Sequence, residues 1–201
     1  MKKKTNALLF YLAILSLYSL VIILFLLTPV RDFFDFFIRI CALLGFTSIF
    51  IASIMSAFMV QIYIYFGKKF IKLHHFFSIL GLILATIHPI AFAINTMNIA
   101  AFVPVFYPFY EFWSLGGRLA LVLIYIAVMA AILRKKIPKY WRQIHFLNYV
   151  ALFLGLIHGI LIGRDFKNPA ILILFTIMTI LTFCGLIYKR YTIHKRKKKK
   201  N

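Results

Sequence analysis

Six apolar runs, each long enough to cross a lipid bilayer, constrain this chain more than any other feature of its sequence. A membrane-spanning helix needs about 20 consecutive apolar residues. Hydrophobic residues make up 64% of the 201 residues and charged residues only 14%, whereas a soluble domain needs a far more polar surface. The sequence therefore predicts an all-α, polytopic membrane bundle of six transmembrane helices. The predicted spans are 7–28, 37–66, 73–94, 119–133, 144–162 and 170–188.

Three of these spans carry local features. The first follows a short lysine run, but its apolar part is longer than that of a signal peptide and no A-x-A site follows, so we expect a retained helix. The second, 37–66, is unusually long and is expected to tilt or protrude. The third contains Pro89 directly after His88, which predicts a kink and a freed backbone carbonyl inside the bundle.

The basic residues predict the orientation of the spans. Cytoplasmic loops of membrane proteins are enriched in lysine and arginine. Nineteen of the 24 basic residues fall on one side of the predicted spans, and all four acids fall on the other. Both termini are therefore predicted to be cytoplasmic, in a multi-pass protein of the plasma or inner membrane. The chain reads as a single domain, 1–201, with a basic cytoplasmic tail at about 189–201.

Charge and cysteine usage exclude two other classes of protein. The formal net charge of +20 could suggest nucleic acid, but the charges lie between apolar runs and form no soluble basic face. We therefore expect no nucleic-acid partner. Cys41 and Cys184 lie inside apolar runs without any CxxC or CxxCH motif, which argues against a zinc ribbon and against covalently attached haem.

The longest outer loop, about 95–117, is rich in aromatic residues and allows two interpretations. The first is an aromatic belt at the membrane interface. The second is a lid over the edge of a cofactor. The aromatic residues are Phe102, Phe106, Tyr107, Phe109, Tyr110, Phe112 and Trp113.

Histidines are the strongest functional candidates, because ionisable groups inside a membrane are costly. Five of the six lie on the third and fifth spans, and His194 lies in the basic tail. A lone histidine could simply hydrogen-bond across helices, but the spacing recurs. Fourteen residues separate His74 from His88, and thirteen separate His145 from His158, so each pair spans roughly 20 Å at about 1.5 Å per residue.

The two spans should run parallel, so the histidines should pair by level. His74 faces His145 near the inner membrane face, and His88 faces His158 near the outer face. Two facing imidazoles can bind a haem iron from both sides, which suits electron transfer. The period of about 100° per residue favours His74 over the alternative His75.

The same period leaves His145 and His158 about 140° apart on an ideal helix. A distortion near Gly155 or a tilt of the helix would be needed to bring both imidazoles to one face.

Two segments resemble the ferric reductase-like transmembrane domain. They are KLHHFFSILGLILATIHP at 72–89 and PKYWRQIHFLNYVALFLGLIH at 138–158. That family includes the membrane parts of ferric reductases and NADPH oxidases and the haem-binding subunit of the periplasmic methionine sulfoxide reductase system. Both histidine spacings match the family's ligand spacings. Where the family often has a glycine, four residues after the first histidine, this chain has Ser78.

The resemblance implies a b-type cytochrome with two haem b groups. His74, His88, His145 and His158 would be the axial iron ligands, and having His74 brings the chain closer to the two-haem pattern than to the methionine sulfoxide reductase subunit. No GxGxxG or flavin motif is present, so FAD or FMN is expected on a separate partner. Candidate partners of the haem propionates are Lys72, Lys139 and Arg142 on the inner side, and Arg118 and Arg164 on the outer side.

The expected function is outward electron transfer, as the membrane component of an oxidoreductase. A cytoplasmic flavoprotein or a membrane quinol would be the donor, and ferric ion, oxygen or a periplasmic reductase the acceptor. One alternative is a haem-binding anchor subunit of a periplasmic reductase, with a single haem. Others are a proton or metal-ion transporter, which should have carboxylates within the spans, and a structural anchor without redox chemistry. Trp141 is expected to anchor the helix at the interface rather than relay electrons.

Overall fold

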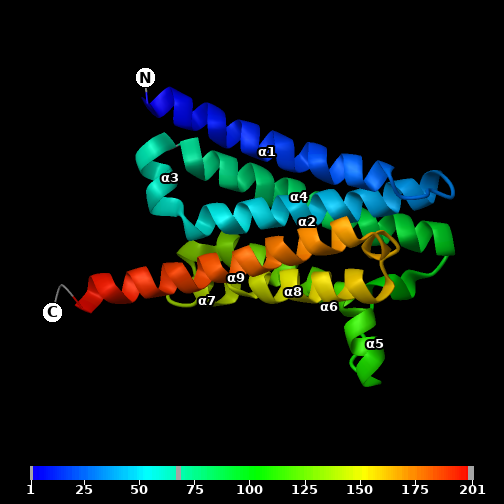
Figure 1. Ribbon diagram of the computed structural model, residues 1–201. Helices are drawn as coiled ribbons and strands as arrows, with labels where there is room; N and C mark the ends of the chain where they lie inside the picture. Colours follow the sequence, from blue (N-terminus) through cyan, green and yellow to red (C-terminus); the bar gives the residue numbers. More distant parts are fainter. Residues whose placement is uncertain (1, 67–68, 199–201) are drawn as a thin grey trace.

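The computed structural model describes residues 2–66 and 69–198 (Figure 1). All regular elements in these ranges are helical, which confirms the predicted fold class. Lys68, Lys199 and Lys200, which entered the charge count above, lie outside the described residues. The α-helices are α1 (Lys2–Leu26), α2 (Phe33–Ala57), α3 (Met59–Phe66), α4 (Lys69–Thr96), α5 (Phe109–Ser114), α6 (Gly116–Ile132), α7 (Trp141–His145), α8 (Leu147–Ile162) and α9 (Pro169–Lys198). Short 3₁₀ turns occur at Ile99–Phe102, Leu133–Lys135 and Asp165–Lys167.

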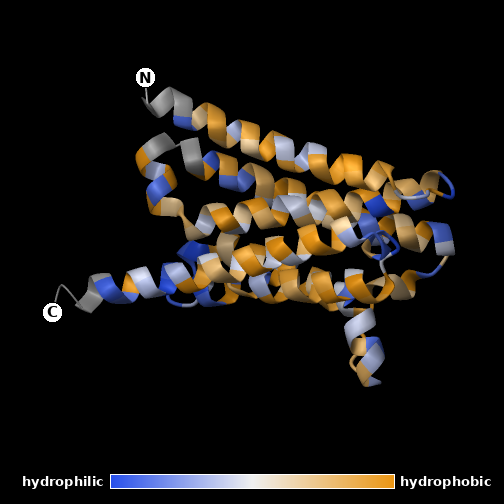
Figure 2. Cartoon of the chain, viewed as in Figure 1, coloured by the Kyte–Doolittle hydropathy of each residue, from blue (hydrophilic) through white to orange (hydrophobic). Residues whose placement is uncertain are grey.

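Six helical segments are long and apolar enough to cross a membrane, as predicted. They are Asn6–Leu26, Phe33–Ala57, Ile71–Thr96, Gly116–Lys135, Trp141–Ile162 and Pro169–Lys195. The start of α1 and the end of α9 lie at one end of the bundle, here called the terminal end. The loops around 27–32, 97–115 and 163–168 lie at the other, the distal end (Figure 1). Apolar residues dominate the middle of the bundle and polar ones gather at its two ends, as a bilayer requires (Figure 2).

The long second run consists of two helices rather than one tilted span. The helix α2 ends at Ala57, and the Phe58 amide donates to the Ile54 carbonyl at 3.1 Å as the cap. The short helix α3 then continues at the terminal end before α4 begins (Figure 1). The helix α2 also begins four residues earlier than predicted, because the Asp32 side chain accepts the Asp35 amide and caps its N-terminus.

The helix α2 is the centre of the bundle. Of its most apolar 18-residue window, 56% is buried, against 11% for α1. It packs closely against α4, while α6 packs closely against α8, so the bundle contains two tight helix pairs with space between them. Three buried hydroxyls are hydrogen-bonded within their own helices. Thr47, Thr179 and Thr182 each donate to the carbonyl four residues earlier.

Two glycines explain the close approach of α2 and α4. A Cβ added at Gly45 would lie 3.1 Å from the Ala85 amide nitrogen. A Cβ at Gly81 would lie 2.7 Å from Ile49 Cγ1 and 3.1 Å from the Ile49 amide nitrogen. Small residues at helix interfaces let backbones approach closely in membranes.

We expect Gly81→Val to destabilise the bundle by about 1–3 kcal/mol, because its side chain would press on α2 backbone. The matched control is Gly155→Ala, whose Cβ would meet only the Phe46 ring, at 3.8 Å. Thermal unfolding of the purified protein in detergent measures both. Equal unfolding temperatures for Gly81→Val and the native protein would contradict the close α2–α4 packing.

Candidate functional site

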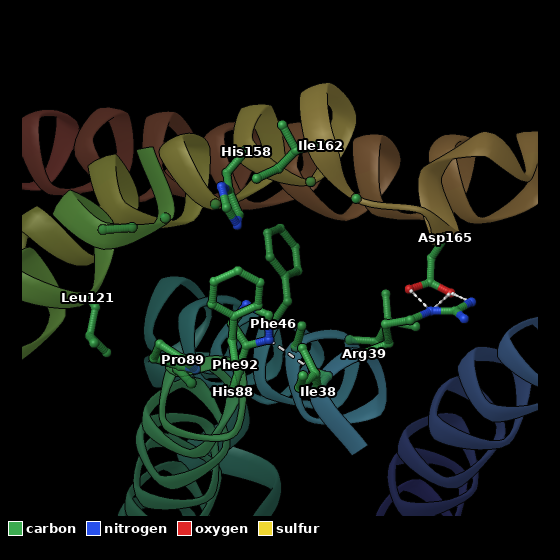
Figure 3. Close-up of a pocket in the computed structure, with 18 of the residues that line it drawn as sticks. Ile38, Arg39, Phe46, His88, Pro89, Phe92, Leu121, His158, Ile162 and Asp165 are labelled. Carbon is green, nitrogen blue, oxygen red and sulfur yellow. Dashed lines mark hydrogen bonds and ion pairs between the residues drawn. The ribbon is translucent and has the colours of Figure 1, made fainter. Parts of the chain in front are cut away.

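The structure brings the four favoured histidines together in two pairs. His88 on α4 and His158 on α8 line a cavity of about 450 Å³. His74 on α4 and His145 at the end of α7 line a separate cavity of about 50 Å³, towards the terminal end. The imidazoles of His88 and His158 face each other from opposite sides of the larger cavity, with ring centroids 6.5 Å apart and planes inclined by 76° (Figure 3).

Each of these four imidazoles has Nδ1 within hydrogen-bonding distance of a main-chain carbonyl of another helix. His88 Nδ1 lies 2.9 Å from the Ile38 oxygen, and His158 Nδ1 lies 2.6 Å from the Ser114 oxygen. His74 Nδ1 lies 3.1 Å from the Ala52 oxygen, and His145 Nδ1 lies 3.0 Å from the Ala127 oxygen.

A carbonyl oxygen can only accept, so each contact assigns the ring proton to Nδ1. In this tautomer Nε2 carries no proton, as is required of a nitrogen that binds a metal. Histidine ligands are commonly oriented in this way by their other ring nitrogen.

A break in the helix at Phe146 reconciles the phases of His145 and His158. The helix α7 ends at His145 and α8 starts at Leu147, and the chain between them makes i to i+3 hydrogen bonds, from Phe146 to Gln143 and from Tyr149 to Phe146. Such turns rotate by about 120° per residue rather than about 100°. The distortion therefore lies next to His145, and not near Gly155 as the sequence suggested.

The remaining two histidines stand apart from both cavities. His75 is exposed, and its ring contacts His74 with centroids 5.9 Å apart. His194 is exposed near the end of α9. Neither residue lines either cavity, so His74, and not His75, is the residue that shares a cavity with His145.

The volume and lining of the larger cavity are compatible with a haem. Its walls are mostly apolar, among them Phe46, Ile124 and Leu152, and arginines line it at the distal end. Its volume lies within the range of about 300–1,000 Å³ typical of ligand pockets. Two imidazoles that bind one iron hold their ligating nitrogens about 4 Å apart, twice a metal–nitrogen distance of about 2 Å. The His88 and His158 ring centroids are 6.5 Å apart. Because each centroid lies behind the ligating nitrogen of its ring, this separation agrees with such a pair.

The smaller cavity does not fit a macrocycle with its side chains in these positions. Its volume of about 50 Å³ suits one or two water molecules. Three serines, Asn148 and Tyr149 contribute polar groups to its lining. The lining serines are Ser53, Ser56 and Ser78.

Among the basic residues expected near propionates, Arg118 and Arg164 line the larger cavity. Arg164 is also ion-paired with Asp35, at 2.6 Å. Lys72 and Arg142 are exposed and line neither cavity, and Arg142 lies over the Trp141 ring, 5.4 Å from its centroid. Lys139 likewise lies over the ring of Tyr140.

The sequence interpretation missed Lys189, which it assigned to the tail. Its ammonium group donates to the Ser56 carbonyl at 3.0 Å and to the Ser56 hydroxyl at 3.1 Å. Because Ser56 lines the smaller cavity, Lys189 is the basic residue that lies beside the His74 and His145 pair. Its place as the first basic residue after the last apolar run was the available signal.

The aromatic residues of the outer loop lie outside the larger cavity. Within the described residues, none of the seven contributes to its lining. Phe106, Tyr107, Phe109 and Tyr110 are all exposed. This placement fits the interfacial belt and not the lid.

A buried cluster of charges at the distal end was also missed. Arg39, only 8% exposed, pairs with Asp165 at 2.6 Å and with Asp35 at 2.8 Å, and it donates to the Pro29 carbonyl and the Thr28 hydroxyl. Asp35 lies near the start of the apolar segment Phe33–Ala57, which is long enough to span a membrane. Both carboxylates are ion-paired, as buried charges must be.

This charge cluster links α2 with the loop that follows α8, and both of these parts of the chain line the larger cavity. Arg39 follows Ile38, whose carbonyl holds His88, and Asp165 lies in the loop after the helix that carries His158. Figure 3 shows the pair beside the cavity. The ion pair therefore fixes the distal end of α2 against the 163–168 loop.

Comparison of the chain with protein-family models, with curated proteins and with solved structures found no match in any of the three.

We expect Asp165→Ala to destabilise the protein by about 3–5 kcal/mol, because it removes a close partner of a buried arginine. Lys167→Ala, an exposed charge in the same loop, should change stability by less than about 0.5 kcal/mol. The double variant Arg39→Met, Asp165→Leu should recover most of the loss, because it leaves no unpaired charge in this pair. Unfolding temperatures in detergent test all three, and a neutral Asp165→Ala would refute the role of the cluster.

Proposed function

We propose that this chain is a transmembrane b-type cytochrome, the membrane electron-transfer component of an oxidoreductase. His88 and His158 would bind one haem b as axial ligands. The observation that carries the proposal is the arrangement of these two rings. They face each other across an apolar cavity, and a carbonyl holds the Nδ1 of each.

The chemistry that haem would supply is reversible one-electron transfer at iron. The residues of this chain would bind the group, keep water from it and fix its orientation. Because two imidazoles would hold the group, the chemistry it would supply is electron transfer rather than oxygen binding. The apolar walls at Phe46, Ile124 and Leu152 would enclose the macrocycle, and Arg118 would pair with a propionate.

His74 and His145 would hold a second haem b about 20 Å away, since fourteen residues at about 1.5 Å each separate His74 from His88. The shared Nδ1 hydrogen-bond pattern and the nearby Lys189 support this site. The side chains around its small cavity would have to separate to admit the macrocycle. That volume of about 50 Å³ favours a second candidate, a one-haem anchor subunit of a periplasmic reductase.

The charge distribution supports an orientation of the chain that is consistent with outward transfer. The terminal end is the basic end, and by the positive-inside tendency it would be cytoplasmic, in the plasma or inner membrane. The donor would be a cytoplasmic flavoprotein carrying FAD or FMN, or a membrane quinol. The acceptor would lie beyond the distal end and would be ferric ion, oxygen or a periplasmic reductase.

Protein purified from haem-replete cells should show a Soret band that sharpens and shifts on reduction with dithionite. His88→Ala and His158→Ala should each abolish binding at the larger cavity, because they remove an axial ligand. His75→Ala is the matched control, an exposed histidine that should leave the spectrum unchanged. A colourless native protein would overturn the proposed function.

Haem content separates the two-haem cytochrome from the one-haem anchor. The two-haem cytochrome predicts two haems per chain, falling to one in His145→Ala and to one in His158→Ala, because each variant loses one site. Pyridine haemochrome content against protein concentration measures this. One haem in the native protein, unchanged by His145→Ala, would assign the chain to the one-haem candidate.

A further inference from the structure

An aromatic segment at the distal end projects from the bundle. It comprises residues 104–114 and contains α5, which points away from the spans (Figure 1). Four of its rings are strongly exposed: Phe106 by 69%, Tyr107 by 87%, Phe109 by 75% and Tyr110 by 62%. Rings of this kind are enriched at the boundary between lipid and water, where their apolar bodies and polar tips meet matching surroundings.

The base of this aromatic segment is fixed to the bundle. Trp113 makes edge-to-face contacts with Phe112 and with Phe153 of α8, at centroid distances of 5.0 and 6.3 Å. Ser114 is only 4% exposed. Its carbonyl accepts the His158 Nδ1 proton at 2.6 Å, the shortest of the four histidine contacts described above. The Ser114 carbonyl therefore links the aromatic segment directly to the His158 ring.

Gly117 also lies close to the same ring. A Cβ added there would lie 2.8 to 3.0 Å from three atoms of the imidazole, Cδ2, Nε2 and Cγ. The His158 ring is thus positioned by the stretch of chain at 114–117, which joins the aromatic segment to the start of α6. A displacement of the segment would displace both contacts.

We infer that the aromatic segment seats in the headgroup region of a phospholipid bilayer, and that this seating holds the Ser114 carbonyl against His158. Lipid is the partner that fits, because the spanning segment of α6 begins at Gly116, directly after α5. The exposed rings therefore lie at the level where a span meets the membrane surface. The inference deepens the proposed function, but the lipid contact and the hydrogen bond exist with or without haem.

Fluorescence quenching in phosphatidylcholine nanodiscs tests the lipid contact without any cofactor. In Trp141→Phe, Trp113 is the only tryptophan, and in Trp113→Phe, Trp141 reports on the terminal end as a control. We expect Trp113 to be quenched most by lipid brominated close to the headgroup and less by lipid brominated deep in the acyl chain. No quenching, or quenching by the deep label alone, would overturn the inference and leave the proposed function standing.

A set of substitutions tests the connection to His158. Changing the four exposed rings to serine should shift the ¹⁵N signal of His158 Nδ1 in histidine-labelled protein, which His158→Asn identifies by its loss. Changing the same rings to leucine should restore the native signal. The matched control converts four other exposed apolar residues of the distal end to serine: Leu27, Phe33, Met97 and Ile99.

An unshifted His158 signal in the ring-to-serine variant, or an equal shift in the control, would overturn the positioning role. A signal that shifts in the ring-to-serine variant and returns in the ring-to-leucine variant, in a native protein that is colourless, would instead count against the proposed function alone, because the comparison between variants does not require bound haem.

Discussion

The hydrogen bond between a histidine Nδ1 and a carbonyl of a neighbouring helix is the interaction on which this structure depends most. Inside a bilayer no water is available to satisfy an imidazole N–H, so a protein acceptor must be supplied. The chain supplies one four times, from Ala52, Ile38, Ala127 and Ser114. Each of these bonds joins two helices, orients a ring and leaves its Nε2 unprotonated. The same contacts thus contribute to packing and set the orientation of the rings that line the two cavities.

Two other constraints keep the His88 and His158 pair in place. Glycines at 45 and 81 let α4 approach α2 closely, so that His88 reaches the Ile38 carbonyl. The buried ion pair of Arg39 and Asp165 then joins α2 to the loop after α8. The larger cavity lies between these tightly packed parts, where side chains from α2, α4, α6 and α8 meet.

The apolar pattern was sufficient to predict the six spans and the grouping of the histidines by level, because hydrophobic length and helix period are local properties. The break at Phe146, the split at Phe58 and the capping of α2 by Asp32 depend on individual backbone hydrogen bonds, so they shifted boundaries without changing the fold. Arg39 and Asp165 are 126 positions apart in the sequence, and nothing local to either residue predicts their pairing. Lys189 was assigned to the tail because it begins a run of basic residues. In the structure it lies on α9, where its side chain reaches back to Ser56.

The most direct measurement is an experimental map of the protein purified from haem-replete cells in nanodiscs. The proposed function predicts a planar feature in the larger cavity that joins Nε2 of His88 to Nε2 of His158 through a central metal. A cavity filled by lipid or side chains, with the two imidazoles unlinked, would contradict it.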